Sequence, residues 1–255
     1  MVTAWPSDEE LIELIPTVMT YADDEFDPMI RDQALKLYLF LPVTYRSLMN
    51  RSSLEALLGD ARQAVGRDPR TGEIVKSEHT RSWLGAMGYL ALIDQMSSMF
   101  ELPAGDGSAF ERLLAWEGLL MADEATALYA LRCAFVHNYG LLNDRRQVAD
   151  RHLADVDLTE AQARKRVRKM TLTHRFELNI GDSTVVSLSD RRFSYDTDPR
   201  VLPPTRVDLS ALSDHCERLV DGVRSRYLDG TGMTMKADME LSAFVSSFFF
   251  RHGVF

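Results

Sequence analysis

Hydrophobic residues recur every three or four positions along most of the chain, and this spacing predicts amphipathic helices. In the first such segment Leu11, Leu14, Ile15 and Val18 fall on one side. The predicted helices cover residues 7–21, 28–41, 54–65, 78–102, 109–121, 123–143 and 208–227, and one more starts at residue 159. The pattern therefore indicates a mainly α protein.

Residues that favour helix ends support these boundaries. Pro28 suits the first turn of a helix because its missing N–H is not needed there. Ser52 or Ser53 can cap the next helix, and Ser77 can cap the long one that ends near Leu102.

Turn residues separate the remaining segments. Gly66 to Gly72 contains glycine, proline and charged residues, so we expect an exposed loop there. The last long helix should begin at Asp208 or Ser210 and break at Gly230.

One part of the chain follows the two-residue period of β-strands. Residues 169–180 alternate, with His174 among the inward positions, and residues 183–189 return after Gly181 and Asp182. We therefore expect a β-hairpin, which must either lie on the helices or pair with another segment. The proline-containing stretch 194–205 is expected to be an extended connector.

The segment 123–143 is the one place where the pattern also suggests chemistry. Its apolar side carries Leu128, Leu131, Phe135 and Leu142. A second side carries the small residues Ala130, Cys133 and Ala134 together with His137, so another backbone of this chain or of a second copy could approach it closely.

Arg132 to Tyr139, RCAFVHNY, resembles the R-x4-H motif of HEPN domains, which are helical domains common in bacterial toxins and antiviral systems. It also fits the longer R-x4-H-x-Y form of HEPN toxins that are paired with minimal nucleotidyltransferase antitoxins. Looser matches end at His152 and His174, but only Arg132 and His137 lie in a long apolar-periodic helix. Family members usually carry a polar residue after the arginine, where this chain has Cys133.

The resemblance implies a HEPN-like helical bundle with an RNase site at a homodimer interface. By that resemblance His137 is the acid/base, Arg132 binds the scissile phosphate, and Asn138 holds the reacting groups. Tyr139 shapes the pocket or receives AMP from a cognate antitoxin. Asp94, from a neighbouring helix, is either a supporting acid or a surface carboxylate.

These residue types suit RNA cleavage through the 2′-OH. Histidine titrates near neutrality and can move protons, while a guanidinium stabilises charge that develops on phosphate oxygens. The mechanism requires no metal or other cofactor, and we expect neither.

Charge is distributed unevenly along the chain. The net charge is −9, but residues 145–175 hold nine basic and four acidic residues. This run is either an RNA-backbone surface or an ordinary solvated helix face. Its densest part consists of Arg164, Lys165, Arg166, Arg168 and Lys169.

The remaining features of the sequence exclude several other classes of protein. Cys133 and Cys216 have neither disulfide nor metal-ligand spacing, and phosphate-loop, zinc-protease and serine-hydrolase motifs are missing. Without an apolar run of about 18 residues, we expect a cytoplasmic protein with no membrane partner.

We therefore predict a HEPN-like helical domain over 1–158, with its core at about 77–143. Residues 159–255 add a basic helix, the β-hairpin and C-terminal helices packed on it as one unit. The expected function is a metal-independent endoribonuclease acting as a toxin or antiviral effector. The alternative is a non-catalytic HEPN-like module that binds a protein or nucleic-acid partner.

Overall fold

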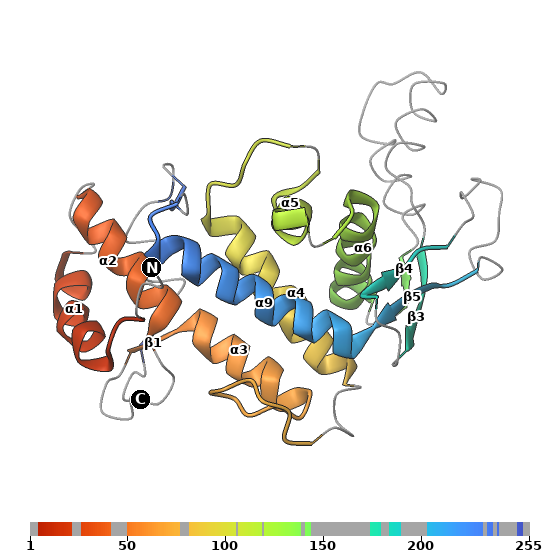
Figure 1. Cartoon of the computed structure of the whole chain (residues 1–255), viewed down its shortest axis with the longest axis horizontal. Coiled ribbons are helices and arrows are strands. Elements are labelled where there is room, and N and C mark those ends of the chain that lie inside the picture. Colours follow the sequence, from red (N-terminus) through yellow and green to blue (C-terminus); the bar gives the residue numbers. More distant parts are fainter. Residues whose placement is uncertain are drawn as a thin grey trace. The chain divides into compact units, whose positions relative to one another are not determined.

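The computed structural model describes residues 5–21, 27–41, 50–76, 82–105, 107–118, 120–138, 141–143, 174–179, 184–189, 203–231, 234–236, 239 and 249–251. Its elements are mainly helical, as predicted (Figure 1). The chain divides into two compact units. The first combines Met1–Leu113 with Ser213–Phe255, and the second is Leu114–Leu212.

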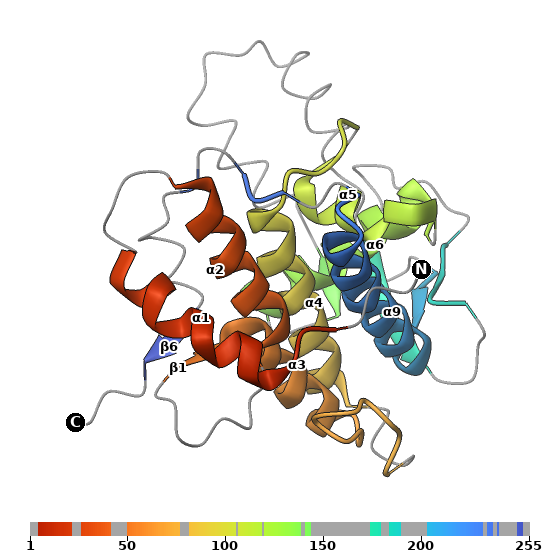
Figure 2. The ribbon, with the colours of Figure 1, turned by 60° about the vertical axis from the view of Figure 1, so that its left-hand side comes forward.

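The first unit is a group of helices, one of which comes from a part of the chain far from the others. It contains α1 (Asp8–Tyr21), α2 (Pro28–Phe40), β1 (Asn50–Ser52), α3 (Ser53–Ala64), α4 (Trp83–Met99), most of α5 (Ala109–Leu114), most of α9 (Leu209–Leu228) and β6 (Phe249–Arg251). Strands β1 and β6 pair antiparallel. Figure 2 shows α9 beside α4 in this unit.

Helices α3 and α4 form a tight antiparallel pair. A Cβ atom on Gly85 would lie 2.2 Å from Val65 Cγ1, and one on Gly88 would lie 3.0 Å from Ala61 Cβ. The two helices therefore approach closely because α4 presents glycine at both crossing positions.

Several helix boundaries follow the predicted local signals. Pro28 occupies the first turn of α2, and the Ser52 hydroxyl accepts a hydrogen bond from Leu54 N at the start of α3. The Asp208 carboxylate accepts one from Ala211 N at 2.7 Å, which caps α9. Gly230 follows α9 with φ of 64°, in the left-handed region that favours glycine.

Two predicted helices are too long. Helix α4 begins at Trp83 with Ser82 as its N-cap, not at residue 78 with Ser77. The helix predicted over 109–121 ends at Leu114, and a 3-10 turn, η2 (Trp116–Gly118), follows it. Apolar periodicity continues through this turn, so the sequence pattern alone did not show the break.

The loop over residues 66–72 is only partly exposed. Pro69 and Arg70 face solvent as predicted, but Gly66, Arg67 and Gly72 are buried. Arg67 is buried because its guanidinium reaches Ser213 and Asp214 on α9, a contact that local sequence cannot reveal.

The described part of the second unit combines a helix with a small sheet. Its described elements are η2, α6 (Ala122–Asn138), β2 (Leu142–Asn143), β3 (His174–Asn179), β4 (Val186–Ser187) and β5 (Thr205–Asp208). The described strands follow the order β2-β3-β5-β4. Helix α6 packs on β2, β3 and β4.

The predicted β-hairpin is wrong. Strands β3 and β4 do not pair with each other, because β5 lies between them, parallel to β3 and antiparallel to β4. Residues 205–208, predicted as the end of a connector and the start of a helix, supply this central strand. The predicted alternation does hold in β3, where Phe176 is buried and Arg175 and Glu177 are exposed.

The predicted domain boundary at 158/159 lies in residues 144–173, outside the described part of the chain. The helix predicted from residue 159 lies there too. None of the described helices is long and apolar enough to cross a membrane.

Candidate functional site

Helix α6 carries the described part of the R-x4-H motif. Met121 N donates to the Glu124 carboxylate at 2.8 Å, and Ala125 N donates to Met121 O at 3.0 Å. Met121 thus caps the helix, which begins at Ala122. The predicted N-cap, Asp123, lies inside the first turn.

The motif helix is shorter than predicted. It ends at Asn138, and Leu142 and Asn143 belong to strand β2 instead. Phe176 N donates to Leu141 O at 2.7 Å, so the chain enters the sheet directly after the motif. The helical periodicity predicted Leu142 and Asn143 as part of the motif helix, but these residues pair with β3 and form a strand.

The predicted inward side of α6 is confirmed for the residues that stay helical. Leu128, Leu131 and Phe135 are buried. Ala130 and Ala134 are buried as well, so the side with small residues is already covered within the single chain at those two positions. Arg132 and Cys133 are half-buried.

The structure places three candidate residues on this one helix. Arg132 lies in its second half, while His137 and Asn138 are its last two residues, whose side chains are outside the described part. Arg132 and His137 are five positions apart, which is about 7.5 Å along the axis and about 140° around it.

The remaining candidates lie in the other unit or outside the described residues. Asp94 is half-buried on α4, in the first unit. Tyr139 lies outside the described residues. So do the basic positions Arg164, Lys165, Arg166, Arg168 and Lys169.

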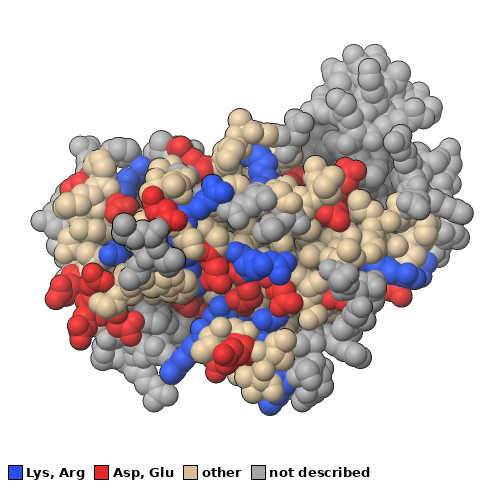
Figure 3. All heavy atoms as spheres, in the orientation of Figure 1, with Lys and Arg blue, Asp and Glu red and all other residues tan. Residues whose placement is uncertain are grey.

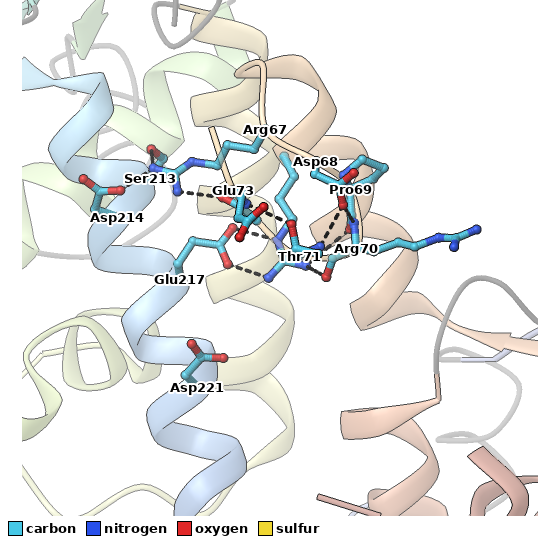
Figure 4. A network of polar contacts seen from close by, with 12 residues as sticks. Arg67, Asp68, Pro69, Arg70, Thr71, Glu73, Ser213, Asp214, Glu217 and Asp221 are labelled. Carbon is cyan, nitrogen blue, oxygen red and sulfur yellow. Dashed lines mark hydrogen bonds and ion pairs between the residues drawn. The ribbon is translucent and has the colours of Figure 1, made fainter. Parts of the chain in front are cut away.

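The first unit contains a buried polar network that the sequence did not predict (Figure 4). Arg62, on α3, donates from Nε to Glu217 Oε1 at 2.9 Å and from Nη2 to Oε2 at 2.6 Å. Tyr89, on α4, donates its hydroxyl to Glu217 Oε1 at 2.6 Å. One carboxylate of α9 therefore joins two other helices.

The same network fixes the loop after α3. Arg62 Nη1 donates to Arg70 O at 3.0 Å, and Arg67 Nη1 donates to Gly72 O at 3.0 Å. Arg67 Nη2 also donates to Ser213 Oγ at 3.2 Å and pairs with Asp214. Two buried guanidiniums thus hold the loop and α9 together.

A third arginine anchors the other end of α9. Arg224 donates from Nε to Leu39 O at 2.8 Å and pairs with Glu55. Its guanidinium carbon lies 5.2 Å from the ring centre of Trp5 and 5.9 Å from that of Phe40. This cation–π contact links the start of the chain to α9.

Burial sets the electrostatics of the network. Burial, followed by the Glu217 carboxylate, raises the pKa of Tyr89, which therefore stays a hydroxyl donor. Burial is the largest single influence on the pKa of Arg62 and lowers it, but the hydrogen bond and charge of Glu217, together with Glu55 and Tyr89, raise the pKa by more. Both groups keep the protonation state that the hydrogen bonds require.

The network joins α3, α4, α9 and the loop after α3 to one another. Its carboxylates and guanidiniums bind each other, so they are not directed toward a reacting group. The signal that could have revealed it is the three- and four-residue spacing of Asp214, Glu217, Asp221 and Arg224, a polar stripe opposite the apolar side of α9.

Surface charge gives no single-sign patch along α9 on the face shown in Figure 3, where the described basic and acidic side chains lie side by side. Among the described residues, no group of three or more His, Cys, Asp or Glu side chains is arranged to hold a metal ion.

Comparisons with protein-family models, with curated proteins and with solved structures found no match.

Proposed function

We propose that this chain is a HEPN-type endoribonuclease that acts as a toxin or antiviral effector. It cleaves RNA through the 2′-OH of the RNA itself. Arg132 binds the scissile phosphate and His137 moves the protons. Cleavage leaves a 2′,3′-cyclic phosphate and a 5′-OH.

The proposal rests on one observation about α6. Arg132 and His137 occupy a single continuous helix, and His137 is its penultimate residue. A side chain at a helix end can reach a ligand beyond the helix, while the buried residues Leu128, Leu131 and Phe135 hold the same helix in place. This agrees with the motif position in the family that the sequence resembles.

Further elements of the proposal follow from that family. The active form is a homodimer in which both copies contribute to the site, and RNA is the substrate. Asn138 and Asp94 support the reacting groups, and the basic residues 164–169 bind the RNA backbone. A cognate antitoxin would control the enzyme by adding AMP to Tyr139, which intact-mass measurement of co-expressed protein would detect.

The test is RNA cleavage in EDTA by purified wild type, His137→Ala and Arg132→Ala. Loss of a general acid/base costs about 10²- to 10⁴-fold, and loss of a phosphate-binding cation costs a similar factor. We expect wild type to produce fragments with cyclic-phosphate ends and both variants to lose at least about 100-fold in rate.

His152→Ala is the matched control, because His152 ends a looser match to the same motif and its replacement should leave the rate unchanged. Thermal unfolding at the wild-type temperature would show that each variant is folded. Full activity of a pure His137→Ala protein would overturn the assignment. No cleavage by wild type of unmodified mass would favour the non-catalytic interaction module.

A further inference from the structure

Helix α6 has one accessible side with sharp limits. From residue 126 to residue 136, every position is either buried or at least partly exposed in a regular pattern. At about 100° per residue, the partly exposed positions fall within one arc of about 120°, and the buried positions all fall outside it. We call these partly exposed residues the accessible side of α6: Thr126, Tyr129, Arg132, Cys133 and Val136.

The accessible side carries positive charge. Of its residues only Arg132 is charged, and the acids of α6, Asp123 and Glu124, lie before it starts. The Glu124 carboxylate accepts a hydrogen bond from Met121 N at 2.8 Å, so it is held at the beginning of the helix. A helix side with a cation and no carboxylate suits the phosphates of a nucleic-acid backbone.

Tyr129 lies near the centre of the accessible side. At about 100° per residue, Arg132 is about 60° to one side of it and the position of His137 about 80° to the other. Tyr129 is half-buried, and Val136, two turns further along the same side, is 49% exposed. The arc between the two motif positions therefore holds an aromatic residue and further apolar surface.

Tyr129 and Arg132 can contact two parts of one nucleotide. Residues three positions apart on a helix are neighbours, with about 5 to 6 Å between their Cβ atoms. The guanidinium suits a phosphate, and the aromatic ring suits a base. The pair therefore offers one contact to the backbone and one to the base.

This combination favours an unpaired RNA strand. In single-stranded RNA the bases can be splayed out and stacked on aromatic side chains, while cations follow the backbone. In a duplex the faces of the bases are covered by their neighbours in the stack. A tyrosine beside a phosphate-binding arginine is therefore of use only with a single strand.

We propose that Tyr129 is a base-stacking residue, which holds a base of single-stranded RNA next to the phosphate bound by Arg132. The inference rests on the proposed function for the role of Arg132. It adds the class of substrate, an unpaired strand, and a contact to the base. Every base has a face that can stack, so Tyr129 contributes affinity and little sequence preference.

Binding to a strand that cannot be cleaved tests this contact. One probe is a labelled single-stranded RNA of about 12 nucleotides with 2′-O-methyl groups throughout, and the other has the same backbone without bases. We expect Tyr129→Leu to weaken binding to the first probe about 5- to 150-fold and to leave binding to the abasic probe unchanged. Tyr129→Phe keeps the ring and should retain wild-type affinity for both.

Two further variants serve as controls. Arg132→Ala should weaken binding to both probes, because it removes a contact to the backbone. Trp83→Leu should affect neither, because Trp83 is a 46% exposed aromatic residue on α4, in the first unit. Thermal unfolding at the wild-type temperature would show that each variant is folded.

Several outcomes would overturn the inference. Equal affinity of the wild type for the two probes would do so without any variant, and so would a wild type that binds neither. Wild-type affinity of Tyr129→Leu for the first probe, or an equal loss on both probes, would do so as well.

The cleavage test is independent of this binding test. Cleavage that depends on His137, with no effect of Tyr129 on binding, would leave the ribonuclease proposal intact. Base-dependent binding through Tyr129 without any cleavage would support the stacking contact and favour the non-catalytic interaction module.

Discussion

Glu217 connects three helices through one carboxylate. It accepts hydrogen bonds from Arg62 on α3 and from Tyr89 on α4, while its own backbone belongs to α9. Arg62 is buried, so its charge depends on this carboxylate to compensate for the water it has lost. Asp214 pairs with Arg67 in the same network, but its side chain is 47% exposed.

Glu217→Gln should therefore destabilise the protein far more than Asp214→Asn. Removing one partner of a buried ion pair leaves an uncompensated charge and costs about 3 kcal/mol. An exposed partner can be replaced by water, so we expect less than about 1 kcal/mol for Asp214→Asn. Urea unfolding at neutral pH measures both, and equal losses would contradict the assigned difference in burial.

At the scale of elements, the contact between α3 and α4 depends on the absence of side chains. Gly85→Ala would place a methyl group 2.2 Å from Val65 Cγ1, whose residue is buried. Overpacking typically costs about 1 to 3 kcal/mol, which exceeds the roughly 1 kcal/mol that alanine gains over glycine in a helix. We expect net destabilisation in thermal or urea unfolding.

A double mutant checks the cause of that loss. Val65→Ala removes the clashing methyl groups, so Gly85→Ala with Val65→Ala should cost less than the two single substitutions added together. Simple additivity would show that the loss comes from elsewhere on α4.

The elements that could be predicted are those with local causes. Ser52 caps α3 through its own hydroxyl, Asp208 caps α9, and Gly230 supplies the backbone conformation that follows α9. Strand β5 could not be placed, because its partners β3 and β4 lie far from it in the sequence. For the same reason Arg67 was expected in an exposed loop.

The candidate site also has a part that could be predicted from the sequence and a part that could not. The helix that joins Arg132 to His137 was predictable from its apolar period, and Leu128, Leu131 and Phe135 are buried as expected. Its end was not, because the pairing of Leu142 with Arg175 is a non-local contact. The buried network was missed because charged residues on a helix normally face solvent.

At the scale of the whole molecule, the first unit is assembled from two separate parts of the sequence. The fragment 1–158, predicted as a domain from the sequence, lacks α9 and with it the partners of Arg62, Arg67 and Glu55. Expressed alone, it should lose cooperative thermal unfolding. A sharp transition like that of the full chain would instead support the boundary at 158/159.

The position of α9 also has a consequence for synthesis on the ribosome. About 100 residues separate the two parts of the first unit. At roughly 5 to 20 residues per second, roughly 5 to 20 s pass between the synthesis of the first part and that of the second part, which contains most of α9. During that time the surface that later receives Cys216, Leu219 and Val220 is uncovered, so a product of interrupted translation is an open assembly exposed to chaperones and proteases.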